Sequence, residues 1–259
     1  MARYFLELAY NGKHFHGWQK QPNAITVQQT LEQTLSTVIQ SSVLLTGAGR
    51  TDTGVHASYF VAHFDMEDPL PFEENVLLRK LNSMLPSSIA VYSVSQVSDE
   101  AHSRFSAIRR SYEYHMILYK DPFLEEVTHR PWFVPDFDRM NLAAERLKDY
   151  TDFTSFARLH GDNKTNFCKI SDAFWEKRGN RYVFVISADR FLRNMVRAIV
   201  GTLLDVGRGK ISVNDFCEII EAQDRCLAGT SAPPQGLFLT DIKYPEKIFS
   251  RKWRGNKSS

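Results

Sequence analysis

A glycine-rich segment with one central aspartate carries the strongest chemical signal in this sequence. It reads Gly47-Ala48-Gly49-Arg50-Thr51-Asp52-Thr53-Gly54-Val55-His56-Ala57. The glycines and small side chains leave backbone amides accessible and allow a ligand to approach closely. Asp52 lies between two threonines, two residues after Arg50. A carboxylate there can act as a nucleophile or as a turn residue, and from the residues alone the turn role is the commoner of the two.

A phosphate-cradling loop is the first alternative for this segment. Such a loop has the pattern Gly-x-x-x-x-Gly-Lys-Ser/Thr and joins a strand to a helix. This chain lacks that pattern, and a strand-like stretch at 59–65 follows the segment. The sequence therefore disfavours a nucleotide-binding loop.

Histidines and cysteines raise the question of a metal site. The candidates are His14, His16, His56 and His63, with Cys168, Cys217 and Cys226 as the three cysteines. No His-x-x-x-His or Cys-x-x-Cys pair occurs, and the nearby carboxylates lack the spacing of metal ligands. We expect the histidines to make hydrogen bonds that order loops, and we expect no metal and no disulfide.

Composition is that of a globular protein, with 43% hydrophobic and 24% charged residues in 259. No apolar stretch approaches the roughly 20 residues of a membrane helix, and no targeting signal opens the chain. We therefore expect a soluble, cytoplasmic protein. The net charge is only +2, but arginines cluster at 104–110 and 190–197, and basic residues at 251–257. Such local clusters are compatible with a nucleic-acid partner.

Periodicity predicts the elements that must position these residues. In the first half we expect strands at 3–10, 43–45, 59–65 and 89–97 and helices at 27–41 and 72–84. Thr26 with Gln29 three residues later has the arrangement of a capping box. In the second half we expect a strand at 111–119, a helix at 138–150, a hairpin of 167–177 with 181–189 around Gly179-Asn180, helices at 191–206 and 213–222, and a strand at 237–244.

These elements predict an α+β fold. The first half has the ferredoxin-like order β-α-β-β-α-β, and the second half repeats it loosely. We expect two such halves with mostly antiparallel sheets and a catalytic cleft between them. The predicted boundaries are 1–105 and 106–246, followed by a basic tail at 247–259.

The segment around Asp52 resembles the Gly-Arg-Thr-Asp-x-Gly-Val-His-Ala signature of the A-type tRNA pseudouridine synthases. Thr53 departs from it, because alanine is commoner there, and we expect the threonine to be tolerated. Further segments agree in the same order along nearly the whole chain: Tyr10-Asn11-Gly12, Phe15-His16-Gly17-Trp18-Gln19, Arg104-Phe105-Ser106-Ala107, Phe191–Arg197 and Ala232–Leu237.

This resemblance implies an isomerase that converts uridine to pseudouridine within tRNA without a cofactor. It implies Asp52 as nucleophile, paired with Arg197, and Tyr112 as the platform on which the flipped base stacks. Arg50 would help to flip or replace the base, and Leu237 would line the pocket. Without the resemblance, Arg197 reads as a solvated helix residue, while Tyr112 and Leu237 read as core residues. Whether Asp52 attacks C1′ of the ribose or C6 of the base stays open.

The resemblance also implies the substrate position and the assembly. The family modifies uridines at positions 38, 39 and 40 of the anticodon arm and forms homodimers in which each tRNA contacts both subunits. Flipping a base costs a few kcal/mol, and stacking on an aromatic ring returns roughly 1–3 kcal/mol.

Three alternatives remain at this stage. An RNA-binding module without catalysis would not need Asp52 together with Arg50 and Arg197. A nucleoside or glycoside hydrolase usually pairs two carboxylates, and no second one is evident beside Asp52. A sister pseudouridine synthase family is disfavoured by the length of the match.

Overall fold

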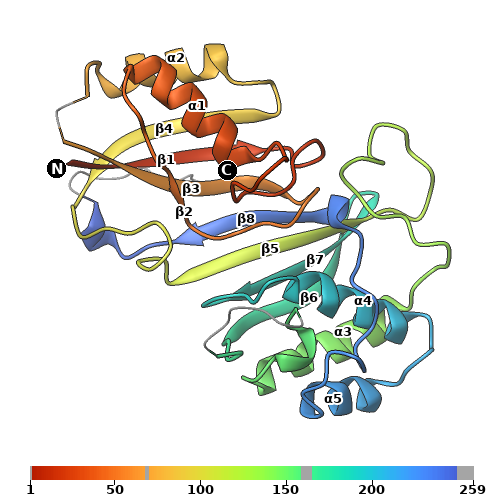
Figure 1. Cartoon of the computed structure of the whole chain (residues 1–259). Helices are drawn as coiled ribbons and strands as arrows, with labels where there is room; N and C mark the ends of the chain where they lie inside the picture. The colour runs from red at the N-terminus through yellow and green to blue at the C-terminus, as the bar shows by residue number, and fades with distance from the viewer. Residues whose placement is uncertain (1, 68–69, 159–164, 250–259) are drawn as a thin grey trace. The chain divides into compact units, whose positions relative to one another are not determined.

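The computed structural model describes residues 2–67, 70–158 and 165–249. The chain divides into two compact units (Figure 1). Unit 1 contains the residues up to Ile108 and those from Asp241 onwards, and unit 2 runs from Arg109 to Thr240. The last ten residues of the predicted basic tail, 250–259, lie outside the described residues.

Unit 1 contains the antiparallel strands β1 to β4 and two helices. Its elements are β1 (Ala2–Tyr10), α1 (Val27–Ile39), β2 (Thr46–Gly47), β3 (His56–Met66), α2 (Glu74–Met84) and β4 (Ile89–Val97). The central strand β1 pairs antiparallel with both β3 and β4. Figure 1 shows α1 and α2 on the same side of these strands. Leu6 and Leu8 of β1, Phe60 of β3 and Leu31 of α1 are completely buried in the core.

The sequence pattern predicted correctly where α1 begins but not where β2 lies. The Thr26 side chain accepts a hydrogen bond from Gln29 N at 3.3 Å, which confirms Thr26 as the N-cap. The predicted strand at 43–45 was wrong. The backbone N–H groups of Val43 and Leu45 donate to side chains of α1, and the strand forms at Thr46–Gly47.

Unit 2 contains β5 (Arg109–Met116), α3 (Phe137–Arg146), β6 (Ile170–Arg178), β7 (Arg181–Ala188), α4 (Met195–Gly207), α5 (Val213–Glu221) and the first part of β8 (Leu237–Lys243). β7 pairs antiparallel with both β5 and β6. The predicted β6–β7 hairpin is confirmed, and Gly179 at its turn has φ +58°. α3 packs on β6 and on the helices α4 and α5.

The hydrogen-bonded strand order is β4-β1-β3-β8-β5-β7-β6, with β2 paired to β3. Together with helices α1 to α5 among the described residues, this confirms the α+β class. Four 3-10 turns complete the described structure: Leu147–Asp149, Thr154–Phe156, Pro234–Gly236 and Glu246–Ile248. No described helix has both the length and the apolar character needed to cross a membrane.

Helix α4 begins four residues later than its sequence pattern predicts. Its N-cap, Asn194, has the left-handed backbone conformation, with φ 67°. A residue in that conformation cannot continue a right-handed helix, so the chain before it is not helical. The predicted buried face is confirmed, because Leu192, Met195, Val196, Ile199, Val200 and Leu203 are all buried.

Candidate active site

The Asp52 loop connects β2 to β3 in unit 1. The Asp52 side chain is half-buried, Thr51 is buried and Arg50 is exposed. Val55 N donates to the Asp52 carbonyl at 3.1 Å, and Gly54 has φ +77°. Asp52 therefore occupies a tight turn in which the residue is neither fully buried nor fully exposed.

The loop at 11–19 holds the Asp52 loop through hydrogen bonds on both sides of the aspartate. Trp18 N donates to the Thr51 carbonyl at 3.2 Å, and Gly54 N donates to the Phe15 carbonyl at 3.3 Å. The Tyr10 hydroxyl and Thr51 Oγ1 are hydrogen-bonded at 2.9 Å in the interior. The backbone flanking Asp52 is thus anchored before and after the carboxylate.

Glycines allow these two loops to touch. A Cβ on Gly12 would collide with the Val55 carbonyl oxygen, and one on Gly17 would collide with the Thr51 carbonyl oxygen. Gly17 also has φ +83°, which disfavours any L side chain. Backbone packed this closely leaves the Asp52 loop little room to move.

Two of the four histidines make the predicted loop-ordering hydrogen bonds. His56 is buried, and its Nδ1 accepts from Gly12 N at 3.1 Å. His63 Nδ1 accepts from Ser103 N at 3.2 Å, in the segment that follows β4. Burial lowers the pKa of His63 to about 4, so its ring is neutral at pH 7. Within the described ranges no group of three or more His, Cys, Asp or Glu residues could hold a metal ion.

Arg197 in unit 2 is fixed by a segment far away in sequence. Its half-buried side chain donates from Nε to the Ala232 carbonyl at 2.7 Å, and Ala232 N donates to the Arg197 carbonyl at 2.9 Å. The segment approaches α4 closely, because a Cβ on Gly201 would collide with the Thr230 carbonyl oxygen. The Arg197 guanidinium is consequently oriented by backbone atoms and is not a freely solvated group.

Tyr112 and Tyr114 on β5 have different surroundings. Tyr112 is half-buried, and its ring meets Phe191 edge-to-face with centroids 5.1 Å apart. Tyr114 is fully buried, and its hydroxyl donates to the Pro233 carbonyl at 2.9 Å. Burial raises the pKa of Tyr114 above its ordinary value. Tyr114 is therefore a structural anchor, whereas the Tyr112 ring is held in one orientation and stays partly accessible.

Leu237 is buried at the start of β8, directly after Gly236, where a Cβ would crowd the Tyr114 ring. The predicted site residues thus fall in two sets. Arg50 and Asp52 lie in unit 1, and Tyr112, Arg197 and Leu237 lie in unit 2.

Sequence reasoning missed the residues that hold the two sets in place. Tyr10, Trp18 and Ala232 occur in the motifs quoted above, but their sequence positions assign them no role. Glycines such as those at 12, 17 and 201 were the local signals of a close backbone approach.

Residues 8–106 and 143–245 match the family described as tRNA pseudouridine synthase. Among curated proteins, the tRNA pseudouridine synthase A of Parabacteroides distasonis is 53% identical over 96% of this chain and 98% of its own. The protein of the same name from Bacteroides thetaiotaomicron is 54% identical over 97% and 94% of the two chains. The one from Thermoanaerobacter sp. is 40% identical over 94% and 100%.

Proposed function

The chain belongs to the tRNA pseudouridine synthase family, a family of isomerases, and on that premise we propose that it converts uridine to pseudouridine at positions 38, 39 and/or 40 of the anticodon stem-loop. The coverage of both halves of the chain by the family match supports the reaction. The choice of positions rests on the resemblance to A-type enzymes.

The observation that carries the catalytic proposal is the half-buried Asp52 carboxylate on an anchored turn. An aspartate carboxylate can act as a nucleophile. In one form of the reaction it attacks C1′ of the ribose, and the bond between C1′ and N1 breaks. The base then turns, C5 attacks C1′ and displaces the carboxylate, C5 loses its proton, and N1, which left C1′ with the bonding electron pair, gains one. Attack at C6 of the base is the other form.

We assign supporting roles to the remaining predicted residues. Arg197 would pair with Asp52, and its fixed orientation suits that role. Tyr112 would stack on the flipped base, as its partly accessible ring permits. Arg50, which is exposed beside Asp52, would help to flip the base, and Leu237 would form part of the pocket wall. In this proposal the residues of the two units act together in one catalytic cleft.

The partners follow from the same premise. We propose tRNA as the substrate, a homodimer as the assembly and the cytoplasm as the place of action. The reaction involves neither redox change nor phosphoryl transfer, so we expect activity without a nucleotide, metal or other cofactor. Sedimentation at micromolar concentration would test the assembly, with a dimer expected at twice the 29.8 kDa chain mass.

Chemical mapping of pseudouridine tests the proposed reaction and its position. An unmodified tRNA transcript with uridines at 38, 39 and 40 is incubated with the protein, and pseudouridine is located by carbodiimide-dependent stops of reverse transcription. Stops confined to these positions are expected. Stops elsewhere in the tRNA would contradict the assigned positions, and a complete absence of stops would contradict the proposed activity.

A further inference from the structure

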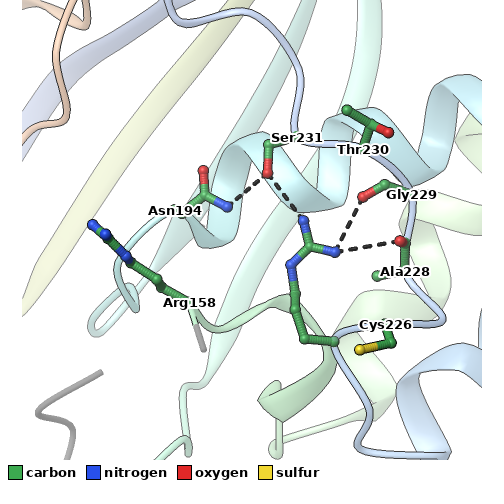
Figure 2. Close-up of a pocket in the computed structure, with 8 residues that line it drawn as sticks. Arg158, Asn194, Cys226, Ala228, Gly229, Thr230 and Ser231 are labelled. Atoms are coloured by element: carbon green, nitrogen blue, oxygen red, sulfur yellow. Dashed lines mark hydrogen bonds between the residues drawn. The ribbon is translucent and has the colours of Figure 1, made fainter. Parts of the chain in front are cut away.

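A cavity of about 590 Å³ in unit 2 lies beside the start of α4 and does not include the proposed catalytic side chains (Figure 2). Its walls come from Arg158, from Asn194 and from the segment 225–231. The lining residues are Arg158, Asn194, Arg225, Cys226, Ala228, Gly229, Thr230 and Ser231. Among the described residues that line the cavity there are two guanidinium groups and no carboxylate, so this lining favours an anion.

Arg225 holds the wall of this cavity in shape. Its Nη1 donates to the Ala228 and Gly229 carbonyls at 3.3 and 3.2 Å. Gly229 N in turn donates to Thr202 Oγ1 on α4 at 2.9 Å. The wall is therefore fixed to α4. Arg225 contributes positive charge to the cavity, but most of its N–H groups are hydrogen-bonded to the loop 228–231.

Ser231 presents a hydrogen-bond donor for which no acceptor occurs in the described part of the chain. Its Oγ accepts from Asn194 Nδ2 at 2.7 Å and from Arg225 Nη2 at 3.1 Å, as the dashed lines in Figure 2 show. A hydroxyl has two acceptor positions and one proton. Both acceptor positions are occupied, which leaves the proton for an acceptor in the cavity.

Arg158 supplies the second cation. Its backbone N donates to the Arg193 carbonyl at 3.2 Å, which ties it to the chain just before α4. The side chain is exposed and forms no ion pair with any described residue. A guanidinium presents several N–H groups in one plane and binds phosphate oxygens in pairs.

We propose that this cavity binds a backbone phosphate of the tRNA, next to the nucleotide that is modified. The inference rests on the proposed function for the identity of the RNA. We place this phosphate next to the modified nucleotide because Ser231 immediately precedes Ala232 in the chain. The Ala232 carbonyl accepts the hydrogen bond from the side chain of Arg197, a proposed catalytic residue. A bound phosphate would receive donors from Ser231 and Arg158, and it would fix the strand that carries the target uridine.

Salt-dependent tRNA binding tests this inference. Wild type, Arg158→Gln and Arg158→Lys are titrated with an unmodified tRNA transcript over a series of salt concentrations. Arg79→Gln is the matched control, since Arg79 is an exposed arginine on α2 in unit 1. We expect Arg158→Gln to bind several-fold more weakly and its slope of log affinity against log salt to become shallower by about 0.7–0.9. Arg158→Lys should keep the wild-type slope, and Arg79→Gln should match wild type.

Two further arms identify the source of the phosphate. Phosphate-ethylation interference on the tRNA should reveal a position where ethylation weakens wild type but not Arg158→Gln. Inorganic phosphate is also added at constant ionic strength while the melting temperature is measured. If Arg158→Gln loses stabilisation by inorganic phosphate yet binds tRNA as wild type does, the cavity takes free phosphate and the inference is overturned.

The failure of this inference differs from the failure of the proposed function. An Arg158→Gln protein with wild-type affinity and salt slope overturns the phosphate site, even if wild type forms pseudouridine. A wild type that binds tRNA and forms no pseudouridine contradicts the proposed function, while the binding comparison still decides the phosphate site.

Discussion

At the residue scale, the Asp52 turn depends on a few hydrogen bonds that come from outside its own loop. Thr51 illustrates this. It is buried, its carbonyl accepts a hydrogen bond from Trp18 N in the loop after β1, and its hydroxyl is hydrogen-bonded to Tyr10 at the end of β1. Small displacements of a reacting group have large effects on rate. The residues around Asp52 should therefore matter for turnover even where they do not touch the substrate.

Tyr10→Phe tests this positioning role. The change removes the hydroxyl that bonds to Thr51 Oγ1 and should lower the free energy of unfolding by about 1 kcal/mol. We expect kcat for pseudouridine formation to fall roughly 3- to 10-fold with little change in KM, because the proposed nucleophile, Asp52, is misplaced. Tyr4→Phe on the same strand is the control, since Tyr4 packs on Phe64 and lies outside the loop contacts. Equal turnover in the two variants would rule out the positioning role.

His63 should make stability depend on pH. Its pKa in the folded protein is about 4, below the ordinary value of 6.5, chiefly because it is buried. As pH falls from 6.5 the unfolded chain takes up the proton first, so the unfolding free energy is highest above pH 6.5 and falls towards pH 4. The slope should be a fraction of the about 1.4 kcal/mol per pH unit of one fully coupled proton.

Denaturant unfolding between pH 4 and 7 checks this expectation, with His63→Asn as the comparison. The asparagine can accept the hydrogen bond from Ser103 N without titrating. The variant should lose less stability on acidification than wild type. Some dependence should remain, because burial also lowers the pKa of His102. Parallel curves for the two proteins would show that His63 does not contribute.

At the scale of elements, α4 is positioned by close contact between its backbone and the segment before β8. Gly201 is the point of contact, since a Cβ there would meet the Thr230 carbonyl. An alanine in a helix interior normally stabilises by about 0.5–1 kcal/mol relative to glycine. In α4, the collision of the added Cβ with the Thr230 carbonyl should instead make the alanine variant less stable than wild type.

Gly201→Ala should therefore destabilise unit 2 and displace the Ala232 carbonyl that accepts the hydrogen bond from Arg197. Overpacking typically costs about 1–3 kcal/mol, which corresponds to a fall in Tm of roughly 2–10 °C for a protein of this size. Gly49→Ala is the stability control, because its added Cβ would have no neighbour within 4 Å. A Tm for Gly201→Ala at or above that of wild type would contradict the tight contact.

At the scale of the whole molecule, the chain returns to unit 1 after completing unit 2. Ile108 N donates to the Lys243 carbonyl at 2.8 Å, and the Tyr244 hydroxyl donates to the Ser103 carbonyl at 2.6 Å. Ser98 N donates to the Ile248 carbonyl at 3.1 Å. Unit 1 is therefore completed only by residues from the end of the chain.

Hydrogen exchange on two truncated chains tests this completion. A chain ending at residue 249 retains the three contacts, and one ending at residue 240 lacks them. Amides of the segment 98–108 should exchange at least about 10-fold faster in the shorter chain, because they lose their buried partners. Equal exchange in both chains would mean that residues 241–249 are dispensable for unit 1.

Local patterns predicted those elements whose cause is local. Thr26 caps α1 through a neighbour three residues away, and Gly179 closes a hairpin between adjacent strands. The start of α4 was missed because the left-handed conformation of Asn194 is a backbone choice that periodicity does not encode. β2 was misplaced because side chains of α1 take the N–H groups of Val43 and Leu45.

In the candidate site, too, features with a local cause could be predicted from the sequence and features that depend on distant residues could not. The contiguous signature singles out Asp52 as a candidate from the sequence alone, whereas the backbone hydrogen bonds to Phe15 and Trp18 that anchor its turn follow from no spacing rule. The contact between Arg197 and Ala232 spans 35 residues, and no spacing rule connects the two. The cavity beside α4 combines Arg158, Asn194 and the loop 225–231, and only the folded unit brings them together.

Tritium release from tRNA labelled at C5 of uridine tests the central claim most directly, because forming the bond between C1′ and C5 expels that atom. Wild type, Asp52→Asn and Asp52→Ala are compared without added metal or nucleotide. The account predicts release by wild type and a loss of at least about 1,000-fold in both variants, as expected when a nucleophile is removed. Release by the Asp52 variants at the wild-type rate would contradict the assignment of Asp52. The absence of release by wild-type protein that binds the tRNA would contradict the reaction itself.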